Sequence, residues 1–133
     1  MDKSEDIVSH IIDHIENILN AQRRFGNDYN TFASDKDYFN SICMSLLQIG
    51  ELANHLTTEF RSAHTGIPWK NLIGLRNVVV HGYGHLDVET VWATVTEDIP
   101  ELYQKCKLII YGSINIRRSN QPNDNASDKK SGR

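Results

Sequence analysis

An arginine, a histidine and a tyrosine lie within eight residues of one another, at Arg76, His81 and Tyr83, in an otherwise apolar segment. A fixed cation, a group that exchanges protons near neutral pH and a hydroxyl together suit the handling of a phosphate. On a helix of about 3.6 residues per turn, Arg76 and Tyr83 share a face, whereas His81 lies about 140° around the axis. Either the helix loosens at Gly82, or a second copy of the chain completes the site.

The elements that must position these residues are helices. The spacing of apolar residues predicts an all-α, up-and-down bundle of four to five helices. We expect helices over about Ser4–Arg24, from just after Ser34 through Leu56, from Pro68 to about His81, and from just after Asp87 to about Tyr111. Ser34 and Asp87 are the predicted N-caps, Gly82 and Gly84 should end the third helix, and Pro100 should kink or divide the last.

Charge is distributed unevenly along the chain. Residues 1–116 carry 9 Lys and Arg against 15 Asp and Glu, whereas residues 117–133 carry 5 against 2. We therefore expect residues 1–112 to form the bundle and residues 113–133 to form a disordered polar and basic tail. An acidic body is a poor general binder of nucleic acid, so any RNA site must create positive potential locally.

Several observations favour a cytoplasmic protein. No apolar run approaches the ~20 residues that span a bilayer, and the acidic N-terminus does not resemble a secretory signal. Cys43 and Cys106 both fall in helical patterns, which predicts reduced core thiols. His10 and His14 are one turn apart but lie off the apolar stripe and lack a third ligand, so we expect neither a metal nor a cofactor.

The motifs resemble those of the HepT-like branch of the HEPN (higher eukaryote and prokaryote nucleotide-binding) family. The resemblance covers roughly residues 5–112 and rests on the order of several segments. These are Ile49-Gly50-Glu51, Ile67-Pro68-Trp69, Ile73 to Asn77, the Arg76-x4-His81-x-Tyr83 signature, Leu86-Asp87 and Val91-Trp92. A polar residue directly after the arginine, here Asn77, is also usual in that family.

The resemblance implies the toxin of a toxin–antitoxin pair, acting as a symmetric homodimer and a metal-independent endoribonuclease. It implies catalytic roles for Arg76, His81 and Tyr83, supported by Asn77 and Glu51. It also implies that an MntA-like minimal nucleotidyltransferase neutralises the chain by transferring AMP to Tyr83. Added phosphates beside Arg76 would occupy the place of the RNA phosphate.

Each of these residues also has a structural interpretation. Arg76 could pair with a carboxylate of the bundle, His81 could cap a helix, and Tyr83 could pack at the bundle edge. A histidine near a helix C-terminus is favoured in its charged form, which suits a general acid. We expect Glu51 to be a buried partner that orients Arg76 or His81, and not a base.

Two other functions remain open at this point. The chain could be a non-catalytic helical adaptor that binds a nucleotide or the nucleotidyltransferase, which its acidic body favours. Alternatively, it could be the antitoxin, with the nucleotidyltransferase as the toxin.

Overall fold

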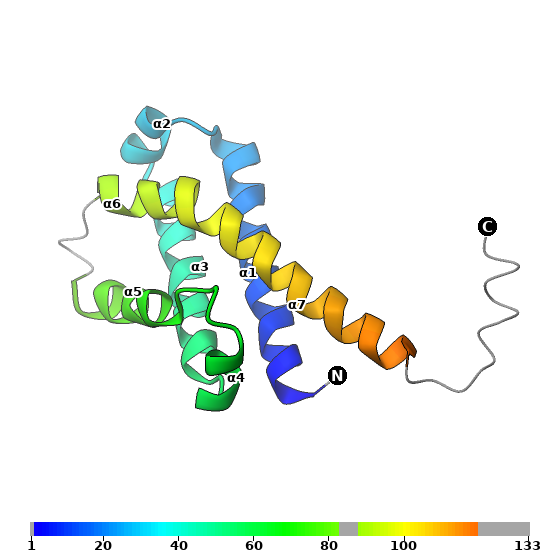
Figure 1. Cartoon of the computed structure of the whole chain (residues 1–133). Helices are drawn as coiled ribbons and strands as arrows, with labels where there is room; N and C mark the ends of the chain where they lie inside the picture. Colours follow the sequence, from blue (N-terminus) through cyan, green and yellow to red (C-terminus); the bar gives the residue numbers. More distant parts are fainter. Residues whose placement is uncertain (1, 83–87, 120–133) are drawn as a thin grey trace, which may run out of the picture.

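The computed structural model describes the backbone of residues 2–82 and 88–119, and the side chains of residues 2–76 and 88–112. Within these ranges all regular elements are helices, which confirms the predicted all-α bundle. Helices α1 (Lys3–Phe25) and α3 (Lys36–Asn54) run side by side in opposite directions. Helix α5 (Trp69–Gly82) crosses α3, and α7 (Ile99–Ser119) crosses α1 (Figure 1).

Helix α1 shows how the sequence sets an element and its buried face. Asp2 accepts a hydrogen bond from the Glu5 backbone N–H at 2.8 Å, and the Glu5 carboxylate accepts one from the Asp2 backbone at 3.2 Å. This reciprocal capping box fixes the first turn. The apolar stripe predicted for this helix is buried at Val8, Ile11, Ile15, Ile18 and Ala21.

The prediction that Ser34 caps the next long helix is wrong by one residue. Asp35 is the N-cap, and its carboxylate accepts hydrogen bonds from the backbone N–H groups of Asp37 and Tyr38. Ser34 instead ends a short helix, α2 (Tyr29–Ser34), where its hydroxyl donates to the Asn30 carbonyl at 2.8 Å. The sequence analysis did not predict α2, because one and a half turns are too short to show a periodic pattern.

A second short helix, α4 (Thr58–Ala63), lies between the second and third long helices, where the sequence analysis predicted no helix. The Thr57 hydroxyl caps it by accepting a hydrogen bond from the Phe60 backbone N–H at 3.0 Å. Trp69, at the start of α5, donates its indole N–H to the His64 carbonyl at 2.9 Å. The first contact fixes the start of α4, and the second fastens the end of α4 to the first turn of α5.

The last helical stretch contains α6 (Val88–Ala93), the π-helical turn η2 (Thr94–Asp98) and α7. The Ile99 N–H bonds to the Thr94 carbonyl five residues earlier, directly before Pro100. The predicted division at Pro100 therefore takes the form of a wide turn beside a residue that has no N–H to donate. Asp87 and Gly84, the other predicted boundary residues, lie outside the described residues.

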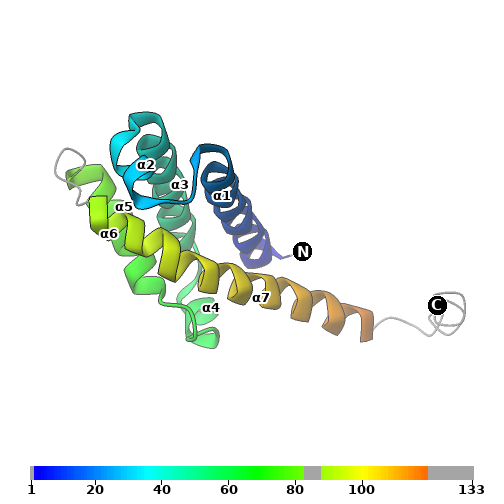
Figure 2. The same cartoon turned by 90° about the horizontal axis from the view of Figure 1, so that it is seen from above.

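Helix α7 does not end near Tyr111, as predicted, but continues to Ser119 (Figure 2). The apolar stripe stops earlier, yet a helix needs a breaker to end it, and Gly112 alone is tolerated inside a helix. The predicted tail therefore cannot begin at residue 113, and its residues 120–133 lie outside the described part of the chain.

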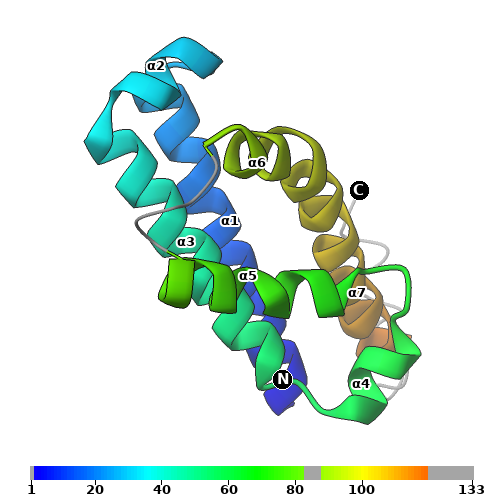
Figure 3. The same ribbon diagram turned by 90° about the vertical axis from the view of Figure 1, so that its left-hand side faces the viewer.

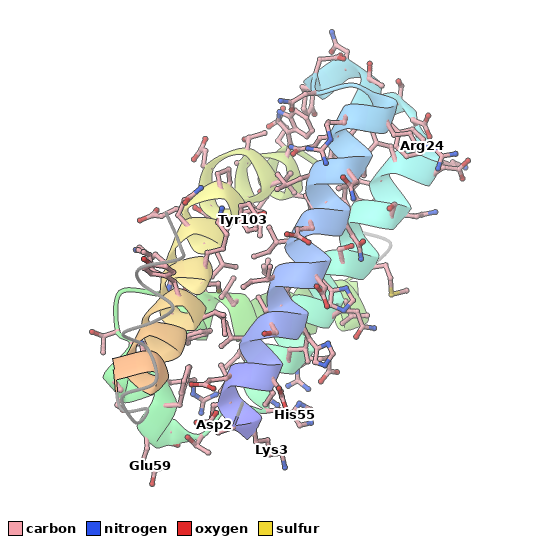
Figure 4. The ribbon with its side chains drawn as sticks, turned by 90° about the vertical axis from the view of Figure 1, so that its right-hand side faces the viewer. Asp2, Lys3, Arg24, His55, Glu59 and Tyr103 are labelled. Atoms are coloured by element: carbon pink, nitrogen blue, oxygen red, sulfur yellow. The ribbon has the colours of Figure 1, made fainter. Side chains whose placement is uncertain are left out.

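Where α7 faces α1, the Tyr103 hydroxyl donates to a Glu16 carboxylate oxygen at 3.0 Å (Figure 4).

The two cysteines are free and buried, as predicted for reduced core residues. Burial raises the pKa of the Cys43 thiol to about 11 and that of Cys106 to about 12. Because the thiolate is the reactive form, neither cysteine is a candidate nucleophile near neutral pH.

Candidate functional site

Helix α5 carries most of the predicted site residues. Arg76, Asn77 and His81 all lie on it, and it stays helical through Gly82. Arg76 and His81 are therefore separated by about 7.5 Å along the axis and about 140° around it. Tyr83 lies outside the described residues, and of Asn77 and His81 only the backbone is described. Because α5 does not loosen before Gly82, one α5 does not turn Arg76 and His81 to the same face.

Glu51 is the ionic partner of Arg76. Its carboxylate oxygen Oε1 lies 3.7 Å from the Arg76 Nη1, and this contact joins α3 to α5. The side chains are 41% and 30% exposed, so the expected pairing is present but the expected burial of Glu51 is wrong. A separation of 3.7 Å is longer than a hydrogen bond, and a half-exposed pair contributes only about 0–1 kcal/mol to stability.

Gly50 brings α3 and α5 into close contact beside this pair (Figure 3). A Cβ at position 50 would lie 2.8 Å from the Leu72 carbonyl oxygen, 3.0 Å from the Arg76 Cβ and 3.1 Å from the Arg76 nitrogen. Only a residue without a side chain allows the two backbones to approach this closely. The two residues of the Gly50-Glu51 dipeptide therefore have different roles. Gly50 leaves room for the backbone of Arg76, and Glu51 forms the ion pair with the Arg76 guanidinium.

The guanidinium of Arg76 keeps hydrogen-bonding capacity at this crossing. Its Nε is buried and has no hydrogen-bond partner among the described residues. Arginine offers five N–H donors in a planar fork, and the carboxylate of Glu51 lies beyond hydrogen-bond distance of the nearest one. Arg76 is thus held in place by its backbone and by a weak ionic contact, which suits a residue that exchanges a carboxylate for a phosphate.

The other histidines that can be described do not form a metal site. His10 contacts Asp13 at 3.8 Å, with both side chains exposed. The His55 Nδ1 lies 2.7 Å from the Glu51 carbonyl oxygen, at the end of α3. Within residues 2–76 and 88–112, no cluster of three or more His, Cys, Asp or Glu side chains could hold a metal ion.

Among the described helices, none combines the length and the apolar character needed to cross a membrane.

Comparison with known proteins gives consistent matches. A family model described as ribonuclease HepT-like matches residues 8–109. A protein of Caldanaerobacter subterraneus named as a candidate RNase is 31% identical over 103 residues, which is 77% of this chain and 90% of that protein. A protein of Methanocaldococcus jannaschii with a similar name is 32% identical over 82 residues, covering 62% of this chain and 75% of that protein.

A third relative, from Thermococcus cleftensis, is named probable ribonuclease HepT. It is 34% identical over 77 residues, which is 58% of this chain and 70% of that protein. No solved structure matches the chain.

Proposed function

This chain belongs to the ribonuclease HepT-like family, as its motifs predict, and from this premise we propose that it is a metal-independent endoribonuclease. The observation that carries the proposal is the placement of Arg76. The crossing at Gly50 fixes its backbone, its guanidinium retains a buried Nε without a described partner, and His81 follows on the same helix.

The chemistry needs no activated water. The 2′-hydroxyl of the RNA attacks the adjacent phosphorus, its proton passes to a base, and the bond to the 5′-oxygen breaks as that oxygen takes a proton from an acid. The products are a 2′,3′-cyclic phosphate and a 5′-hydroxyl. Arg76 binds the phosphate oxygens, and His81 transfers protons; such acid–base help is typically worth about 10²–10⁴ in rate.

Two protons move in this reaction, whereas one chain supplies a single histidine in the motif. The active form we propose is a symmetric homodimer in which two copies of His81 act as base and acid. The course of α5 supports this, because the positions of Arg76 and His81 lie about 140° apart around one uninterrupted helix. In the dimer we propose, the twofold axis lies where it places the arginine of each copy beside the histidine of the other.

The proposal extends to a toxin whose Tyr83 receives AMP from a cognate MntA-like nucleotidyltransferase. Asn77 and Tyr83 would assist at the phosphate. Expression of this chain alone should then slow cell growth, and co-expression of the nucleotidyltransferase should restore it. Arg76→Ala should also restore growth, whereas Arg24→Ala, an exposed arginine on α1, should leave the chain harmful. Harm from the nucleotidyltransferase alone would reverse the two roles.

The activity is tested most directly with purified, unmodified protein and total cellular RNA in excess EDTA. We expect the parent chain to cut RNA and His81→Ala to lose at least about a hundredfold of the rate while remaining dimeric. Equal cleavage by both would contradict the role of His81. If neither cuts, and intact mass excludes a nucleotidylated Tyr83, the chain is a binding module and the ribonuclease proposal is wrong.

A further inference from the structure

A surface pocket of about 460 Å³ lies where the end of α3, helix α4 and the start of α5 meet. Six of its eight lining residues are polar or basic: Asn54, Thr58, Arg61, Ser62, Thr65 and Lys70. Trp69 and Ile73 add an apolar wall from α5. The volume falls within the range of small-ligand sites, about 300–1,000 Å³.

The chemistry of this pocket is that of an anion site. Both charged residues in its lining are basic, and the other polar ones can all donate hydrogen bonds. The Arg61 Nη1 donates to the Ala53 carbonyl at 3.3 Å, which holds the guanidinium at the pocket. Lys70 is exposed and is the second residue of α5, where the helix dipole also favours a negative group.

The pocket continues the surface on which Arg76 lies. On α3, Asn54 is the third residue after Glu51, and on α5, Ile73 is the third residue before Arg76. Each step is about one turn, or about 4.5 Å along the helix. Because Glu51 contacts Arg76, the pocket adjoins this ion pair along both helices, toward the first turn of α5.

We propose that the pocket bounded by Arg61 and Lys70 binds a backbone phosphate of single-stranded RNA next to the phosphate held by Arg76. This inference rests on the proposed ribonuclease function and adds to it a binding subsite. The hydroxyl and amide groups of the lining suit the ribose and phosphate oxygens, and contacts of this kind fix the register of a strand without reading its sequence. In this proposal the subsite supplies the local positive charge that a chain of net charge −3 needs in order to bind RNA.

The test measures RNA binding without cleavage. A fluorescein-labelled 20-nucleotide oligouridylate is titrated with the dimeric His81→Ala protein in EDTA at several salt concentrations, and anisotropy is recorded. Adding Lys70→Ala should weaken binding about three- to tenfold and reduce the slope of log K against log salt by about 0.7. Lys70→Arg should restore most of the affinity.

Lys36→Ala is the matched control. Lys36 is exposed and lies in the first turn of α3, as Lys70 does in α5, but at the opposite end of α3 from the pocket. Alanine is a strong helix former, so both variants should fold, which thermal melting by circular dichroism checks. Equal weakening by Lys70→Ala and Lys36→Ala would overturn the subsite and leave the ribonuclease proposal intact. No binding by the His81→Ala parent would overturn both.

Trp69 gives a second measurement that needs no change in the pocket. The chain has two tryptophans, so Trp92→Phe leaves Trp69 alone to report on the pocket wall. Unlabelled oligouridylate should change the emission of this variant with the same midpoint as the anisotropy titration. Unchanged Trp69 emission at saturating RNA would count against the subsite even if Lys70→Ala weakens binding.

Discussion

Two neighbouring stretches of the chain carry opposite charge. Residues 58–82, which span α4 and α5, contain three basic residues and one acidic residue, whereas residues 88–101, from α6 into α7, contain four acidic residues and no basic one. Each borders a surface pocket. The pocket at α4 and α5 is lined by Arg61 and Lys70, and the pocket at α2 and α6, of about 360 Å³, is lined by Glu89 and Glu97.

This difference shows where RNA can approach an acidic protein. The basic residues of α4 and α5 attract phosphates, and the acidic residues of α6 repel them. The net charge of −3 is therefore distributed unevenly between two sides of the molecule. Glu59, the one acidic residue of the basic stretch, is exposed and points outward from α4 (Figure 4). The carboxylate that does approach the basic side is Glu51, which contacts Arg76 from α3.

The acidic pocket is built on the aromatic part of the core. Trp92 lines it and packs on Phe32, with ring centroids 4.9 Å apart, and on Tyr29 at 6.4 Å. Phe32 in turn packs against Tyr38 at 5.0 Å. Burial raises the pKa of the Tyr38 hydroxyl. This side of the molecule thus holds α2 and α6 against α3, whereas the basic side is held by the close approach of α3 and α5 at Gly50.

Among the variants considered, we expect the largest loss of RNA cleavage from one that disrupts the close contact of α3 and α5 at Gly50. In Gly50→Ala, the added Cβ meets the Leu72 carbonyl and the Arg76 backbone, so α5 must move away from α3. Overpacking of this kind costs about 1–3 kcal/mol of stability. Because a displacement of about 1 Å at a catalytic group can cost about a hundredfold in rate, we expect RNA cleavage to fall about 10- to 100-fold, measured at a temperature where the variant remains folded.

Gly74→Ala is the matched control for this change. Gly74 also lies on α5, but a Cβ there would meet nothing within 4 Å among the described atoms. Alanine is the better helix former by about 0.5–1 kcal/mol, so this variant should melt at a higher temperature and keep its cleavage rate. Parent-like cleavage by Gly50→Ala would show that the α3–α5 contact does not position Arg76.

The sequence predicted the long helices well because each buries a stripe of apolar residues over several turns. The stripe of α1 and the helical course of α5 from Trp69 to Gly82 both follow the expected pattern. Prediction failed where structure depends on single side chains. The short helices α2 and α4 are set by the caps Asp28 and Thr57, and one and a half turns show no period. The end of α7 was also predicted wrongly, because the polar residues after Tyr111 do not end the helix, which continues to Ser119.

Of the residues predicted for the site, the structure describes the side chains of Glu51 and Arg76. The carboxylate within an apolar stretch predicted that Glu51 is a buried partner of Arg76 or His81; the contact is with Arg76, and both side chains are partly exposed. Arg61 and Lys70 were not singled out, because they belong to segments nine residues apart that meet only when α4 folds back onto α5. A Thr-x-x-Phe cap before Arg61 was the one local signal that could have placed α4 there.

Neutralising the Glu51 carboxylate, which contacts Arg76, should change RNA cleavage less than Gly50→Ala does. Glu51→Gln keeps the shape of the side chain and removes the charge that competes with phosphate for Arg76. Exposed ion pairs are worth about 0.2–1 kcal/mol, so we expect RNA to bind about two- to fivefold more tightly and stability to change by less than about 1 kcal/mol. If Glu51 also orients Arg76, the rate constant at saturating RNA should fall as KM falls.

The matched control for Glu51→Gln removes a charge from the acidic side. Glu97→Gln makes the same chemical change beside Trp92, where we expect no phosphate, and screening at about 0.15 M salt should keep its effect on RNA affinity below about twofold. Comparable gains in the two variants would mean that RNA responds to net charge and not to the basic side. A gain confined to Glu51→Gln would show that the contact between α3 and α5 sets where phosphate binds, because among the described side chains Glu51 is the carboxylate that pairs with Arg76.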